Sequence, residues 1–138
     1  MSFDLERFVN AQQGTYDRAL NELIAGRKQS HWMWFIFPQI RGLGRSETAR
    51  LYAISGRPEA EAYLAHPVLG SRLEDCTRAM LSHPDLSAND ILGSPDDLKF
   101  HSSMTLFSEI AGQRPLFRGA LELFYRGAQD RQTLGILS

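Results

Sequence analysis

Two segments of this 138-residue chain hold the side chains best suited to chemistry, residues 28–46 and 96–105. The first begins with Lys28, Ser30 and His31, and the stretch from residue 23 to residue 46 contains four basic side chains and no acidic one. In a protein whose net charge is −1, this asymmetry predicts a local positive patch. The alternative is that these charges are solvated or meet acidic side chains from elsewhere in the fold.

The sequence RGLGRS at residues 41–46 favours an anion site more than any other stretch. Gly42 and Gly44 allow the backbone to approach a ligand closely, and Ser46 is suited to cap the helix that follows. Free backbone N–H groups at a helix start, with Arg41 and Arg45 beside them, can bind phosphate or carboxylate. The stretch matches neither a P-loop nor a dinucleotide-binding fingerprint. A tight turn between two packed helices explains the glycines equally well.

In the second segment, polar side chains lie along a predicted helix that begins after Ser94. At about 100° per residue, Lys99 and Ser103 share a partly buried flank, whereas Ser102 and Thr105 share another side. A lysine on such a flank reaches water, pairs with an acid or binds a ligand anion. Lys99 and Ser102 are three residues apart, but in the opposite order to the Ser-x-x-Lys of penicillin-binding proteins. A nucleophilic dyad is therefore disfavoured.

The histidines and the cysteine are not spaced as metal ligands are. The four histidines have no His-x-x-x-His spacing, and the single cysteine, Cys76, lies on an apolar stripe that is typical of a buried, inert thiol. His66 and His83 each precede a proline near a helix end, where a cation complements the helix dipole. We therefore expect no metal and no cofactor.

Apolar periodicity and capping signals predict a string of short helices. The periodic stretches are residues 5–12, 16–24, 58–64, 69–80, 95–111, 116–124 and 131–136. Ser46, Ser94 and Asp130 are suited to be N-caps, and residues 87–90 resemble a capping box. The apolar run 32–37 fits a helix or a strand, and we expect a short helix that ends near Pro38. One all-α domain over residues 1–138 follows, with about seven or eight short helices packed orthogonally rather than as a long-helix bundle.

Composition places the chain among ordinary globular proteins, with 43% hydrophobic and 22% charged residues. A single cysteine fits a reducing compartment, and the start, MSFDLERFVN, lacks the basic and apolar regions of a signal peptide. The longest apolar run has six residues, too few to span a bilayer. We expect a cytoplasmic protein without a membrane partner, and a homo-oligomer is compatible with these numbers. The slightly negative charge makes nucleic acid the least favoured partner.

Five motifs in register carry a family resemblance: GRKQSHWMWFIFPQIRGLGRS, YAIS, AYLAHPVLGSRL, PDDLKFHSSMTLF and YRGAQDRQTL. Together they resemble a family of small, uncharacterised, mostly bacterial proteins, some of which have carried the label calpastatin. The resemblance implies a mainly α-helical single domain and no established reaction. It does not imply calpain inhibition, because calpastatins are disordered animal proteins whereas this chain can form a core.

The resemblance also implies which polar residues belong to the family pattern: Lys28, Ser30, His31, Trp32, Gln39, Gly42, Gly44, Ser46, Asp96, Asp97, Lys99, Ser102, Ser103, Thr105 and Asp130. A pattern so rich in polar groups is more typical of a site than of a scaffold. The Phe-Pro run followed by a Gly/Ser turn is similar, as an analogy, to α-helical enzymes that act on ADP-ribose and related glycosides.

In a first hypothesis, the chain binds or transforms an anionic small molecule, such as a nucleotide or an ADP-ribose-like compound, between residues 28–46 and 96–105. His31 is the candidate general acid or base, because imidazole titrates near neutral pH. Trp32 or Trp34 would pack on a ring. The candidate ligand-binding residues are Lys28, Ser30, Trp32, Trp34, Gln39, Arg41, Gly42, Gly44, Ser46, Lys99, Ser102, Ser103 and Thr105.

In a second hypothesis, the chain is a non-enzymatic interaction or homodimerisation module, and its polar residues cap helices or form buried networks. The sequence does not decide whether the protein is an enzyme. Convergence of the two segments on one pocket favours the first hypothesis. Pairing of Lys99 with Asp96 or Asp130, or the lack of a pocket, favours the second.

Overall fold

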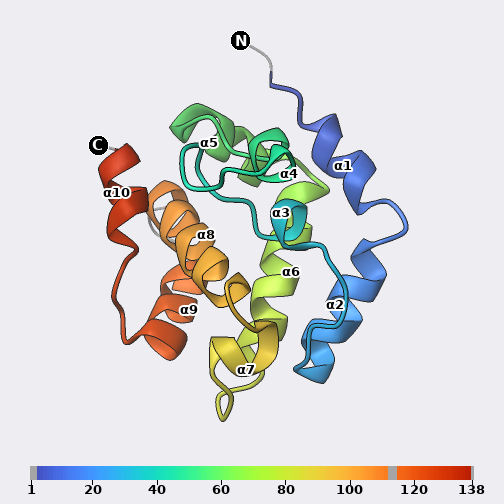
Figure 1. The fold of residues 1–138 in the computed structure, drawn as a ribbon, viewed down its shortest axis with the longest axis vertical. Coiled ribbons are helices and arrows are strands. Elements are labelled where there is room, and N and C mark those ends of the chain that lie inside the picture. Colours follow the sequence, from blue (N-terminus) through green and yellow to red (C-terminus); the bar gives the residue numbers. More distant parts are fainter. Residues whose placement is uncertain (1–2, 112–114, 138) are drawn as a thin grey trace.

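The computed structural model describes residues 3–111 and 115–137, and these residues form ten helices and no named strand (Figure 1). In chain order the helices are α1 (Glu6–Gln12), α2 (Tyr16–Ala25), α3 (Met33–Ile36), α4 (Glu47–Leu51), α5 (Arg57–Ala65), α6 (Leu69–Leu81), α7 (Ala88–Leu92), α8 (Asp96–Ala111), α9 (Pro115–Tyr125) and α10 (Arg131–Leu137). The prediction of an all-α fold of short helices is confirmed. Within the described ranges, no helix combines the length and the apolar character that a membrane crossing requires.

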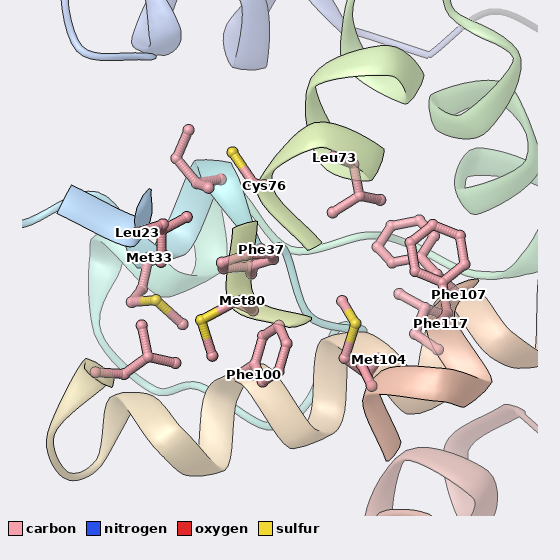
Figure 2. Close-up of a cluster of buried hydrophobic side chains, with 14 of the residues drawn as sticks. Leu23, Met33, Phe37, Leu73, Cys76, Met80, Phe100, Met104, Phe107 and Phe117 are labelled. Carbon is pink, nitrogen blue, oxygen red and sulfur yellow. The ribbon is translucent and has the colours of Figure 1, made fainter. Parts of the chain in front are cut away.

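The core lies around α6 and α8. Helix α8 packs against α5, α7, α9 and α10, whereas α6 packs against α2, α5 and α9. Apolar side chains from these elements meet in one cluster, shown in Figure 2, where Phe100, Met104 and Phe107 are fully buried on one face of α8 as periodicity predicts. The rings of Phe37 and Phe100 meet edge to face, with centroids 4.8 Å apart. This contact fixes the end of the aromatic run against α8.

The aromatic run itself forms the one-turn helix α3, as expected. Trp32, Met33, Ile36 and Phe37 are buried, and the helix ends before Pro38. A proline disfavours helical backbone at the residue before it, which accounts for the short length. Most of the run therefore fills the core.

Residues 41–53, here called the arginine loop, leave the core and return to it at the same place. The neck of the loop is a parallel bridge between Ile40 and Ile54, where Arg41 N donates to Ile54 O and Ile54 N donates to Gln39 O, both at 2.8 Å. Arg7 of α1 holds the returning limb, because its guanidinium donates to two backbone carbonyls there at 2.7 and 2.9 Å. Backbone hydrogen bonds thus set where the loop lies.

Three predicted helix starts carry the expected caps. A backbone N–H of α4 donates to Ser46 Oγ at 3.1 Å, and Ser87 and Asp90 form the reciprocal capping box of α7. Asp130 accepts from a backbone N–H in the first turn of α10 at 3.2 Å. Side chains that the sequence places before helices therefore satisfy N–H groups that lack a partner inside the helix.

Two predictions about helix ends are wrong. Helix α8 begins at Asp96, so Pro95 is not its first residue and Ser94 is not its N-cap; the Ser94–Pro95 peptide bond is cis. His66 does not act as a cation at a helix end. Its Nδ1 accepts from two backbone N–H groups at the start of α6, at 3.1 and 3.2 Å. The ring of His66 therefore caps the start of α6 as a hydrogen-bond acceptor.

Candidate functional site

The two segments singled out in the sequence meet along a groove of about 240 Å³. Its lining comes from the loop after α3, from the start of α8 and from the start of α10. The lining residues are Gln39, Leu43, Gly44, Pro95, Leu98, Lys99, His101, Ser102, Asp130 and Gln132. We refer to this feature as the groove.

A second cavity, here called the arginine pocket, lies in the arginine loop and has a volume of about 390 Å³. Arg41, Arg45 and Arg50 line it together with Gly42, Gly44 and Ala53. Among the ion pairs of residues 3–111 and 115–137, none includes any of these three arginines. The pocket therefore gathers three positive charges that have no acidic partner in the described structure.

Glycines shape the arginine pocket. Gly42 has a φ of +105°, a backbone conformation that side chains disfavour. A Cβ at Gly44 would lie 2.4 Å from Ala49 Cβ, so the turn packs directly onto α4. Gly44 also borders the groove, so the two cavities adjoin at this residue. The glycines fit a ligand site or a tight turn in the sequence, and the close packing supports the tight turn.

Lys99 brings a further cation to the groove. Its ammonium lies 3.7 Å from Asp96 Oδ1 and 5.1 Å from the centroid of the Trp34 ring, and its side chain stays 26% exposed. Lys28 pairs with the other oxygen of Asp96 at 2.9 Å and is only 8% exposed. Lys28 is thus committed to a nearly buried ion pair, whereas Lys99 keeps access to solvent. The Lys99–Asp96 pairing is also the contact that the interaction-module hypothesis expected.

Glu22 accepts hydrogen bonds from two of the candidate residues, Ser30 and Trp32. Its carboxylate accepts from Ser30 Oγ at 2.6 Å, from Trp32 Nε1 at 2.9 Å, and from the backbone N–H groups of Gln29 and Ser30 at 2.8 and 3.1 Å. Burial raises the pKa of this carboxyl, but the four hydrogen bonds outweigh burial and lower the pKa to about 2. The polar groups of Ser30 and Trp32 therefore hold the loop before α3 onto α2.

Ser102 and Thr105 dock α10 onto α8, and they share one side of α8 as predicted. Ser102 Oγ donates to Asp130 Oδ2 at 3.0 Å, and Asp130 N donates to Thr105 Oγ1 at 2.8 Å. Thr133 adds two more donors to the same Oδ2, at 2.6 and 3.2 Å. All described hydrogen bonds to this carboxylate reach Oδ2, so Oδ1 has no partner among the described residues.

The remaining candidates lie outside both cavities. His31 is exposed in the loop before α3, and Trp32 is fully buried, so its ring cannot pack on a ligand. Ser103 is fully buried, and its hydroxyl has no hydrogen-bond partner among the described residues. Ser46 is used as the cap of α4, which has only five residues and thus a weak dipole. The helix-start contribution to anion binding is therefore smaller than the sequence suggested.

Sequence reasoning omitted Arg50, His101 and Gln132 from the site. Arg50 lies in the last turn of α4, where cations are common, so its position in the sequence did not indicate a binding role. His101 and Gln132 lie far apart in the sequence, and the packing of α10 on α8 brings both to the groove. Cys76, by contrast, is buried as predicted, and burial raises its pKa to about 12. The described residues contain no group of three or more His, Cys, Asp and Glu side chains placed to hold a metal ion.

Comparison with known proteins identifies the family. Residues 2–137 match the family described as protein of unknown function, DUF1810. The fold is similar to the crystal structure of the conserved hypothetical protein Rv1873 from Mycobacterium tuberculosis, with 49% sequence identity and a TM-score of 0.96. This similarity covers 98% of the chain and 96% of the other protein. No curated protein matches the sequence. The expected resemblance to an uncharacterised family is confirmed, and the chain belongs to the DUF1810 family.

Proposed function

We propose that the protein binds a small anionic molecule, with its phosphate or carboxylate in the arginine pocket and the rest of the molecule in the groove. One observation carries the proposal: Arg41, Arg45 and Arg50 surround a single concave cavity and have no acidic partner among the described residues. Guanidinium groups bind carboxylate and phosphate through paired, charge-assisted hydrogen bonds, which makes them suited to this role.

The charge around the two cavities supports an anion more than a cation. Four cations line them, the three arginines and Lys99, against one carboxylate, Asp130. This excess of positive charge lies in a protein whose net charge is −1. Like charges held close together repel one another, and a bound anion relieves that repulsion. Because the three arginines are exposed, salt screens them, so affinity should fall as ionic strength rises.

The polar contacts of several candidate residues favour the interaction-module hypothesis. Lys99 pairs with Asp96, and Ser46, Ser102 and Thr105 cap or dock helices. As a second candidate function, we propose that the protein acts as a homodimerisation module whose polar groups are structural. Sedimentation analysis over a range of protein concentrations tests this directly, because a module of this kind must self-associate.

A thermal-shift screen at low ionic strength tests the anion-binding proposal. The probes are inorganic phosphate, sugar phosphates, nucleotides, ADP-ribose and dicarboxylates. A ligand at 100 times its Kd should raise the free energy of unfolding by about 2.7 kcal/mol. We expect Arg50→Ala and Arg41→Ala to abolish the shift while the unliganded protein stays folded.

Arg118→Ala is the matched control, because Arg118 is an exposed arginine on α9 outside both cavities. It removes the same charge and should keep the ligand shift. If Arg118→Ala weakens binding as much as Arg50→Ala does, the effect comes from net charge and the arginine pocket is not the site. If no probe shifts the melting temperature, the proposal fails.

A further inference from the structure

The groove offers polar groups of the kinds that recognise hydroxyls. Gln39 and Gln132 have amide side chains, Lys99 has an ammonium group, and Asp130 has a carboxylate. An alcohol both donates and accepts, so a wall that mixes donors with acceptors satisfies several hydroxyls at once. Inorganic phosphate or a simple carboxylate has no hydroxyl-bearing body that would use this wall.

Asp130 is a fixed acceptor in that wall. Three donors, one from Ser102 and two from Thr133, hold its Oδ2 at 2.6–3.2 Å, which locks the carboxylate plane. Its Oδ1 has no partner among the described residues. A group that is already oriented loses little entropy when a ligand arrives, so Oδ1 is suited to accept from a ligand hydroxyl.

The groove lacks a free aromatic surface for a nucleobase. Of the described lining residues, His101 alone has an aromatic ring, and that ring is stacked on Tyr125 with centroids 4.0 Å apart. Trp34 lies under the Lys99 ammonium, and Trp32 is fully buried. Bases bind proteins largely by stacking on exposed rings. A sugar does not require such a surface.

We infer that the ligand is a sugar phosphate, whose phosphate occupies the arginine pocket and whose hydroxyls contact Asp130, Gln132 and Gln39 in the groove. The inference rests on the proposed function and narrows it from any small anion to one chemical class. Gly44 borders both cavities, so one compact molecule can reach both.

Isothermal titration at low ionic strength tests this inference with four probes: inorganic phosphate, ribose 5-phosphate, glucose 6-phosphate and AMP. We expect at least one sugar phosphate to bind about tenfold more tightly than inorganic phosphate, since two or three hydroxyl contacts supply that difference. AMP should bind no more tightly than ribose 5-phosphate. Gln132→Ala should remove most of the extra affinity of the sugar phosphate over inorganic phosphate and leave the Kd of inorganic phosphate unchanged. Arg50→Ala should weaken the binding of both inorganic phosphate and the sugar phosphate.

Gln13→Ala is the matched control, because Gln13 is an exposed glutamine at the end of α1, outside both cavities. It should change none of the four affinities. Equal affinities for inorganic phosphate and both sugar phosphates overturn the inference and leave the proposed function standing. Tighter binding of AMP than of ribose 5-phosphate, or an equal loss for all probes in Gln132→Ala, also overturns it. If no probe binds, the proposed function itself fails.

Discussion

Replacing Glu22 with glutamine should weaken the fold in a way that depends on pH. Glu22→Gln keeps the size of the side chain but removes the charge that accepts four hydrogen bonds from residues 29–32. Lowering the pKa from 4.5 to about 2 corresponds to about 3 kcal/mol of stability in the ionised state. Because the carboxylate is partly open to solvent, we expect the variant to lose about 1–2 kcal/mol at pH 7.

The sign of the pH dependence follows from the lowered pKa. The folded protein holds the ionised form of Glu22 and the unfolded chain binds the proton more readily, so the stabilisation is complete above about pH 5. It is lost as the pH falls from about 4.5 towards 2. At pH 3 roughly three-fifths of it should be gone, and the stabilities of the two proteins should approach each other.

Urea unfolding of both proteins at pH 7 and pH 3 measures this difference. All other acidic groups are common to the two proteins, so the change in the gap isolates Glu22. Glu61→Gln, which alters an exposed carboxylate on α5, is the control and should match the parent protein at both pH values. If the free energies of unfolding of the parent protein and Glu22→Gln differ as much at pH 3 as at pH 7, the reasoning is refuted, because a neutral carboxyl would then stabilise the loop equally well.

Three further changes test other parts of the structure. Gly44→Ala should destabilise the protein by about 1–3 kcal/mol in urea unfolding, because its Cβ would lie 2.4 Å from that of Ala49. The same variant should abolish any anion-dependent thermal shift. Gly119→Ala, in open space within α9, should instead raise the free energy of unfolding by about 0.5–1 kcal/mol. An unchanged Gly44→Ala protein would contradict the packing. Cys76 should react with a thiol reagent at neutral pH only as fast as the protein opens, because burial raises its pKa to about 12; rapid labelling of the native protein would contradict this. Lys28→Ala should lower the free energy of unfolding by about 1–3 kcal/mol, because it leaves the partly buried carboxylate of Asp96 without its nearest cation. An unchanged urea midpoint would show that this ion pair contributes nothing to stability.

The helices could be predicted because their signals are local. A stripe such as Phe100, Met104 and Phe107 specifies a helix and its buried face without knowledge of any other segment. Side-chain caps such as Ser46 act within one turn and are equally readable. The prediction of Ser94 as a cap failed because Pro95 lies between it and Asp96, where the helix begins.

The roles of the polar candidates could not be predicted, because their partners lie far along the chain or in another element. Ser30 and Trp32 have the residue types of a binding site, but both donate to Glu22 of another element. One signal was present: an acid in the last turn of a helix opposes the dipole, which indicates a partner elsewhere. Asp130 meets Ser102 across 28 residues, a contact that only the packing of α10 on α8 creates.

The neck of the arginine loop bears on how far the length of that loop can change. Two backbone hydrogen bonds close the neck: Arg41 N donates to Ile54 O, and Ile54 N donates to Gln39 O. Neither bond uses a side chain of residues 41–53. The entropy of closing a loop grows slowly with its length, by about 0.6 kcal/mol for each doubling. A longer or shorter arginine loop should therefore cost little loop-closure entropy, because both hydrogen bonds of the neck can form whatever the number of residues between them.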